Sequence, residues 1–196
     1  MLGRCRKCPL LVKTRSRVVP GYGCVPAKIM FIGLAPGRNG ADITGIPFTR
    51  DPSGVLFQKA LINAGLSKET DPHKEKPALR EAYVTNLVKC NPKDSKGNNR
   101  TPSRNEIHNC MEFLKVEEEL VKPRVIIPLG KHVSECILGT KIHRMSEIHG
   151  RATLKGNVVV IPFIHPSYVV RGAYHKKRYM ADFKSIRSLN GKRLKK

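Results

Sequence analysis

One stretch of the sequence, GLAPGRNGADITGIPFTRD at residues 33–51, combines residue types that could do chemistry. Gly33, Gly37 and Gly40 leave the backbone bare, which permits close approach to a ligand and exposes N–H groups that can bind anions. The same glycines would also suit a tight turn from a strand into a loop. Asp42 adds a carboxylate, and Phe48 presents an aromatic ring where nothing nearby resembles a core.

Two more polar side chains follow apolar runs farther along the chain. Asn86 lies in YVTNLVKC and His165 lies in FIHPSYVVRG. A carboxamide can donate and accept hydrogen bonds on one edge, and a neutral imidazole can donate from one nitrogen while accepting at the other. These side chains could therefore read a polar ligand and stabilise a charge that develops on it.

Four short apolar runs, rich in β-branched residues, must position these side chains. They do not alternate with polar residues, which is typical of strands buried on both faces. Helical patterns separate them, so we predict a three-layer α/β/α fold with a central four-stranded, mainly parallel sheet. Ligands bind such sheets beyond the carboxyl ends of the strands, where the glycine-rich stretch, Asn86 and His165 would meet. The predicted strands cover residues 28–33, 82–88, 124–130 and 157–164.

The intervening helices carry recognisable start signals. Ser53 is predicted to cap a helix that ends at Gly65, and Ser103 with Glu106 has the spacing of a capping box. Further helices are expected over 131–139 and 179–189. No linker or repeat divides the chain, so we expect a single domain over 1–196, with a basic tail at 191–196.

The charge of the chain favours a polyanionic partner. The sequence has 37 Lys and Arg against 15 Asp and Glu, a formal net charge of +22. Because each neutralised phosphate releases counterions, this charge favours nucleic acid, although a basic surface can also serve solubility. No run approaches the roughly 20 apolar residues of a membrane span, and the N-terminus does not resemble a signal peptide. We expect a monomeric, cytoplasmic, nucleoid-associated protein that binds no membrane.

Four of the six cysteines could form one site. Cys5 and Cys8 have the C-x2-C spacing that lets two thiolates reach one metal or cluster, and Cys90 and Cys110 bracket a polar loop. Together they could staple the N-terminus to the body of the protein. The alternative is a set of scattered, buried thiols.

The ordered motifs GLAPG…GIPFTRDPSG, YVTNLVKCNP and IPFIHPSYVVRG resemble the uracil-DNA glycosylase superfamily. The resemblance spans nearly the whole chain and is closest to the iron–sulfur branches called family 4 and family 5. Leu34 in the first motif is similar to family 5, whereas Gly37 and HPSYVVR are more similar to family 4. The resemblance implies a DNA repair enzyme that flips uracil out of DNA and hydrolyses its N-glycosidic bond, leaving an abasic site.

The resemblance also implies a ligand set and a DNA-binding segment. Cys5, Cys8, Cys90 and Cys110 match the cysteines that carry a [4Fe–4S] cluster, and zinc is the less favoured alternative for four thiolates. Ser167 would contact a phosphate and Arg171 the DNA backbone. Tyr168 is a candidate for the wedge that fills the space left by the flipped base, as are two valines that follow it, Val169 and Val170.

The resemblance assigns roles in the substrate pocket as well. Phe48 would stack on uracil, Asn86 would read its O4 and N3–H, and His165 would hydrogen-bond O2 and stabilise the developing anion. Gly33, Ala35 and Gly37 would line the pocket through their backbone. Ala35 stands where the best-known branch has its water-polarising aspartate.

The motifs therefore leave two aspartates as candidates for the residue that activates water. Asp42 matches an acidic position common in family 4 and is our candidate to orient water or to stabilise the sugar cation electrostatically. Asp51 is the second candidate. The small residue Gly37 would also allow a broader pocket for hypoxanthine or xanthine. A DNA-binding protein of the same fold without turnover is a further alternative. A nucleotide-binding enzyme is disfavoured, because GLAPG matches neither common phosphate-loop pattern.

Overall fold

The fold is built on one sheet whose centre matches the prediction. The computed structural model describes residues 2–189, so the predicted basic tail lies outside the described residues. Six strands have the order β1-β3-β2-β4-β6-β5. The four central strands are parallel and comprise β3 (Ala82–Asn86), β2 (Ile29–Gly33), β4 (Val125–Pro128) and β6 (Val158–Val160).

Two antiparallel strands at the sheet edges were not predicted. β1 (Tyr22–Gly23) pairs with β3, and β5 (Thr153–Lys155) pairs with β6. Both are too short to produce a periodic pattern of their own. The predicted four-stranded, mainly parallel sheet is thus the core of a six-stranded one.

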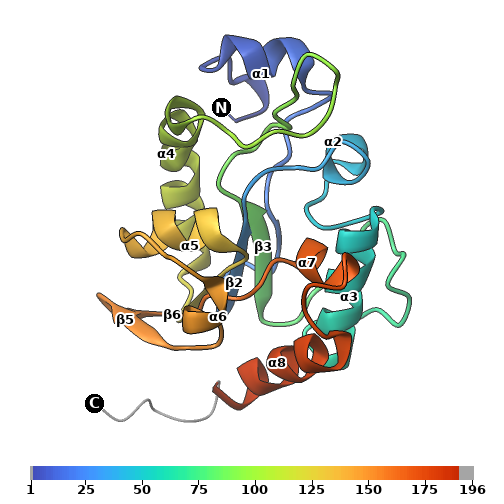
Figure 1. Ribbon diagram of the computed structural model, residues 1–196, viewed down its shortest axis with the longest axis vertical. Coiled ribbons are helices and arrows are strands. Elements are labelled where there is room, and N and C mark those ends of the chain that lie inside the picture. Colours follow the sequence, from blue (N-terminus) through green and yellow to red (C-terminus); the bar gives the residue numbers. More distant parts are fainter. Residues whose placement is uncertain (1, 190–196) are drawn as a thin grey trace.

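Helices cover both faces of the sheet, so the three-layer prediction is confirmed (Figure 1). One face packs against α3 (Pro52–Asn63), α7 (Pro166–Val170) and α8 (Lys176–Leu189) through residues such as Phe31, Phe57 and Phe183. The other face packs against α4 (Arg104–Val121) and α5 (Lys131–Leu138) through residues that include Met30 and Leu114.

A third, smaller apolar cluster attaches the N-terminal segment to the carboxyl end of the sheet. The segment contains a 3₁₀ turn, η1 (Leu2–Arg4), and α1 (Pro9–Thr14), which Figure 1 shows above α4. Leu11 of α1 is buried against Val88, Cys90 and Cys110. The chain reaches the sheet edge after this segment and later forms two more short helices, α2 (Ala41–Thr44) and α6 (Met145–Ile148).

The helix starts show one confirmed and one incorrect prediction. Ser103 and Glu106 form the predicted reciprocal capping box at the start of α4. Ser53, however, is not the cap of α3, because Asp51 takes that place and accepts a hydrogen bond from the Gly54 N–H at 2.7 Å. Among residues 2–189, no helix is both long enough and apolar enough to cross a membrane.

Candidate functional site

A cavity of about 300 Å³ lies at the carboxyl ends of β2 and β3, as the sequence predicts. Its wall combines residues from the glycine-rich stretch, the end of β3, the following loop and the start of α7. These residues are Leu34, Ala35, Pro36, Gly37, Ala41, Phe48, Asp51, Ser53, Asn86, Asn91, Pro92, Asn99, Arg100, His165, Ser167 and Arg171. Cavities of this size accept small-molecule ligands.

Phe48 lies in the cavity wall and has a strained backbone conformation. Its φ is 54°, a conformation that non-glycine residues seldom adopt and that tends to occur at functional sites. Gln58 fixes this conformation by donating from Nε2 to the Phe48 carbonyl at 2.9 Å. The ring lies 4.6 Å from the ring of Phe57 and 5.7 Å from that of His165, measured between centroids. The aromatic face is thus supported from behind and lies beside the histidine.

Asn86 lies at the end of β3 and is only 2% exposed. Gly33, its register partner on β2, leaves the space that Asn86 and Phe48 occupy, because a Cβ there would lie 2.3 Å from Asn86 Oδ1. The Asn86 carbonyl accepts a hydrogen bond from Lys89 Nζ at 2.7 Å. Lys89 is fully buried and also pairs with Glu117 at 2.6 Å. A buried ion pair thus anchors the backbone of Asn86.

His165 caps α7 and presents its second ring nitrogen for other contacts. Nδ1 accepts a hydrogen bond from the Ser167 N–H at 3.1 Å. Since that nitrogen accepts, the proton of the neutral ring is on Nε2. Burial lowers the pKa of His165, the positive charge of Arg171 acts in the same direction, and the resulting pKa is about 4. His165 is therefore a neutral hydrogen-bond donor at physiological pH.

The two candidate carboxylates have different surroundings. Asp42 is fully buried and does not line the cavity. Its oxygens accept hydrogen bonds from the Ser16 N–H (3.0 Å) and hydroxyl (2.8 Å), and Lys93 Nζ lies 2.9 Å away. Asp51 does line the cavity, and burial raises its pKa against the opposing effect of the Gly54 and Ser53 N–H groups. The structure thus brings Asp51, and not Asp42, to the other site residues.

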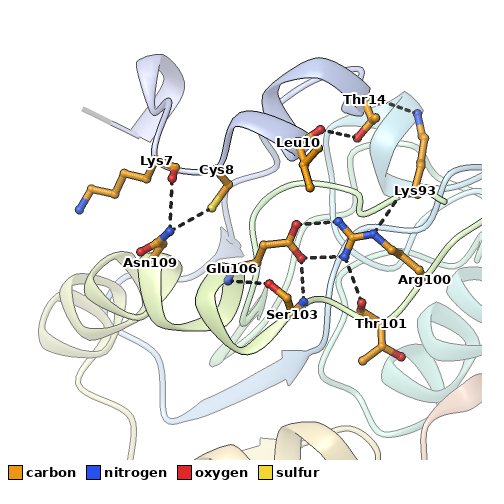
Figure 2. Close-up of polar contacts among 10 residues, drawn as sticks. All are labelled: Lys7, Cys8, Leu10, Thr14, Lys93, Arg100, Thr101, Ser103, Glu106 and Asn109. Carbon is orange, nitrogen blue, oxygen red and sulfur yellow. Dashed lines mark hydrogen bonds and ion pairs between the residues drawn. The ribbon is translucent and has the colours of Figure 1, made fainter. Parts of the chain in front are cut away.

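The loop after β3 supplies a wall of the cavity that the sequence did not indicate. Asn91 donates from Nδ2 to the Pro36 carbonyl and to Asn99 Oδ1, which ties the loop to the glycine-rich stretch. Arg100 forms a bidentate pair with Glu106, at 2.8 and 2.6 Å (Figure 2). These residues lie in a polar loop whose sequence has no distinctive spacing. The sequence predicted where this loop ends, from the capping box at Ser103, but not that its side chains line the cavity.

The predicted DNA-binding residues lie at α7, in the cavity wall or next to it. Ser167 and Arg171 line the cavity, whereas Tyr168 lies outside its wall and is 53% exposed. The Arg171 guanidinium lies 5.0 Å from the centroid of the Tyr168 ring, a cation–π contact. Val170 is also exposed, while Val169 is buried in the core. An exposed aromatic ring and a cation thus lie together beside the cavity.

The four candidate cysteine ligands come from the N-terminal segment, the beginning of the loop after β3, and α4. Cys8, Cys90 and Cys110 belong to one apolar cluster. Arg15 links Cys5 to it, because its guanidinium donates to the Cys90 sulfur at 3.1 Å and to the Cys5 carbonyl at 2.9 Å. In the part of the chain that the structure describes, no three His, Cys, Asp or Glu side chains form a group that could hold a metal ion.

N–H groups point at the sulfurs of this cluster. Asn109 donates to Cys8 Sγ at 3.5 Å (Figure 2), and the Lys89 N–H donates to Cys110 Sγ at 3.4 Å. Burial raises the pKa of Cys110 to about 11 and also raises that of Cys90. The sulfurs of Cys8, Cys90 and Cys110 thus each have an N–H partner. Soft sulfur donors with such partners and an apolar shell are chemically suited to a thiolate-bound centre.

Fold and site define a basic α/β protein, with a formal net charge of +22, that has a small-ligand pocket at the carboxyl edge of its sheet. Residues 20–184 match the model of the uracil DNA glycosylase superfamily. The chain therefore belongs to the uracil DNA glycosylase superfamily.

Characterised relatives align with most of this chain. It is 34% identical to a type-4 uracil-DNA glycosylase of Archaeoglobus fulgidus, over 96% of this chain and 89% of the relative. A type-4 enzyme of Thermotoga maritima is 32% identical, over 89% of this chain and 82% of the relative. A type-5 enzyme of Pyrobaculum aerophilum is 32% identical, over 85% and 79%. Both types thus resemble this chain at similar identity.

Proposed function

We propose that this protein is a uracil-DNA glycosylase that removes uracil from DNA and leaves an abasic site. The observation that carries the proposal is the meeting of Phe48, Asn86 and His165 in one cavity of about 300 Å³. The names of its relatives support the same activity. A protein that only bound DNA would not need a pocket of this size with these three side chains.

Each side chain has a role that its position permits. Phe48 stacks against the flipped uracil, and the Asn86 carboxamide accepts from N3–H and donates to O4. As the bond between C1′ and N1 breaks, negative charge develops on the uracil ring. The Nε2–H of His165 donates to O2 and stabilises that charge without transferring its proton. Ser167 and Arg171 hold the DNA backbone at the cavity mouth, and Tyr168 fills the vacated position in the duplex.

Excision from defined oligonucleotides tests the activity. We expect the purified protein to create alkali-labile sites at uracil, with little cleavage at thymine. Parallel strands with hypoxanthine or xanthine test the broader range that the small Gly37 would allow. Binding without cleavage at any base would refute the enzyme and favour the DNA-binding alternative.

Within this proposal, Asp51 orients the water that attacks C1′ and accepts its proton. Its Oδ1 caps α3, and the residue lines the cavity. Its Oδ2 lies close to the space that a Cβ at Gly37 or Gly40 would take. The ionised form is required, and burial raises its pKa, so the rate should fall on acidification at a higher pH than for an exposed aspartate. Asp42 would instead hold the segment at Ser16 and the β3 loop together.

We predict that Asp51→Asn lowers the single-turnover rate on uracil-containing DNA by about 100-fold or more. Asparagine is also a good helix cap, so α3 should keep its start and the melting temperature should change little. Asp42→Asn is the matched comparison and should affect stability more than rate. If Asp42→Asn lost more rate than Asp51→Asn at equal stability, Asp42 and not Asp51 would be the residue that orients the water.

The proposal also includes a [4Fe–4S] cluster on Cys5, Cys8, Cys90 and Cys110. The apolar cluster that contains Cys8, Cys90 and Cys110, and the N–H groups directed at these three sulfurs, support it. When bound, the cluster would supply a structural crosslink between the N-terminal segment, the β3 loop and α4. The excision chemistry uses none of it. Zinc on the same thiolates is the alternative.

We predict that anaerobically purified protein contains iron and acid-labile sulfide in equal amounts. Cys110→Ser should lose most of the iron. If the free energy of unfolding also falls by about 2 kcal/mol, the melting temperature should fall by roughly 4–8 °C. Cys24 is not one of the four candidate ligands, so Cys24→Ser is the control and should keep its iron. Stoichiometric zinc without sulfide would favour the alternative, and absence of both would refute the metal site.

A further inference from the structure

The segment that leads to His165 runs beside β4 beyond the end of β6. The Ile161 N–H donates to Ile126 O and the Phe163 N–H to Pro128 O, both at 2.9 Å. These odd-numbered residues bond toward β4, so the backbone groups of the even-numbered residues point to the opposite edge. β5 covers that edge only at Val158–Val160. The edge beside residues 161–165 therefore needs another partner.

The residues after α6 take the place of the missing strand. The Gly150 N–H donates to Pro162 O at 2.9 Å, and the Ile164 N–H donates to His149 Nδ1 at 3.1 Å. A backbone N–H can only donate, so Nδ1 is unprotonated and the ring proton is on Nε2. The side chain of His149 thus satisfies the amide directly before His165.

Asp182 and Tyr174 orient the His149 ring. Nε2 lies 3.0 Å from Asp182 Oδ2, to which it donates, and the Tyr174 hydroxyl donates to the same oxygen at 2.9 Å. Burial raises the pKa of Tyr174 to about 12, with its bond to Asp182 acting in the same direction, so the hydroxyl stays protonated. The His149 side chain is 11% exposed and packs against the rings of Phe163 and Tyr174, at 5.0 and 5.2 Å.

This network contacts both ends of the segment that carries His165 and α7. Ile164 precedes the segment, and Tyr174 follows it. None of the three network side chains lines the cavity, so they can act on the reaction only through the backbone. We propose that His149, oriented by Asp182 and Tyr174, is a positioning residue that holds His165 in place to donate to uracil O2. This inference rests on the function proposed above.

The test compares two bases that differ in their need for His165. The 5-fluorouracil anion is the more stable leaving group, so its release depends less on a donor at O2. His149→Phe should slow uracil release by about 10- to 100-fold in single turnover, and 5-fluorouracil release by clearly less. His149→Asn should restore most of the rate, because Asn Oδ1 can accept from the Ile164 N–H.

Three further variants complete the test. Tyr174→Phe removes one hydroxyl and should give the same pattern with a smaller loss, even if His149→Phe does not fold. His132→Phe, at an exposed histidine on α5, is the control and should leave both rates unchanged. Adding His149→Phe to His165→Ala should cost little more than His165→Ala alone, because both changes remove the same donor.

The outcomes separate this inference from the proposed function. Equal losses on both bases, an unchanged rate, or full additivity with His165→Ala would overturn the positioning role while leaving the glycosylase proposal intact. Failure of the native protein to release either base would overturn the glycosylase proposal and this inference with it.

Discussion

Gly33→Ala is expected to lower uracil excision by roughly 100-fold while leaving the fold intact. A Cβ at this position would lie 2.3 Å from Asn86 Oδ1 and 2.7 Å from the Phe48 ring. Real Cβ atoms do not approach other atoms so closely, so Asn86 or Phe48 must move. Displacement of about 1 Å at a reacting site is enough for a loss of this size. A single methyl group would thus disturb, at once, both residues that we propose to contact the base.

The backbone at this position does not itself require glycine. Gly33 lies in β2 and is not among the glycines with positive φ, so alanine should cost little conformational energy there. Single-turnover kinetics and thermal melting should be measured together. Gly3→Ala is the control, because a methyl group there meets nothing within 4 Å. A native rate in Gly33→Ala would show that Asn86 and Phe48 do not need their observed positions.

The second large effect is expected at His165. His165→Ala and His165→Asn should each lower the single-turnover rate on uracil by about 100- to 1,000-fold, as expected for loss of one donor to a developing anion. The two variants differ at α7. Asparagine can still accept from the Ser167 N–H and keep the cap, whereas alanine loses about 1 kcal/mol of stability. Equal rates with unequal melting temperatures would separate catalysis from capping.

The pH dependence gives a further readout for the same residue. The pKa of His165 is lowered to about 4, so the ring stays neutral as the pH falls from 8 to about 5. Its protonation should therefore not reduce the rate in that range. A fall in rate that begins above about pH 5 would come from protonation of another group, for which Asp51 is our candidate. This fall should then be absent from Asp51→Asn. An acid limb near the ordinary histidine pKa that persists in Asp51→Asn would contradict the neutral role of His165.

Much of the scaffold could be predicted because its signals are local. Unbroken apolar runs marked the four central strands, and the spacing of Ser103 and Glu106 marked the start of α4. Parallel strands place their carboxyl ends on one edge, so the meeting of Phe48, Asn86 and His165 also followed from the order of the elements. Strands of two or three residues, such as β1 and β5, carry no such periodic signal.

The direction of side chains in irregular segments could not be predicted in the same way. Asp42 and Asp51 both lie in the stretch of residues 33–51, and nothing in their local sequence shows which of them faces the cavity. Contacts with Ser16 and Lys93, which lie 26 and 51 positions away in the chain, draw Asp42 into the interior. Asp51 both caps α3 through Oδ1 and lines the cavity. Because Asp51 is the cap, Ser53 does not have the predicted capping role.

The sequence by itself determined the layered α/β scaffold, the edge of the sheet that carries the site, and the basic character of the surface. Only the tertiary structure decided which carboxylate enters the cavity, that the β3 loop forms one of its walls, and that His149 supports the segment before His165. The physical reason is the range of the interactions. Apolar periodicity and helix caps act over a few residues, whereas loop side chains are oriented by partners far away in the chain.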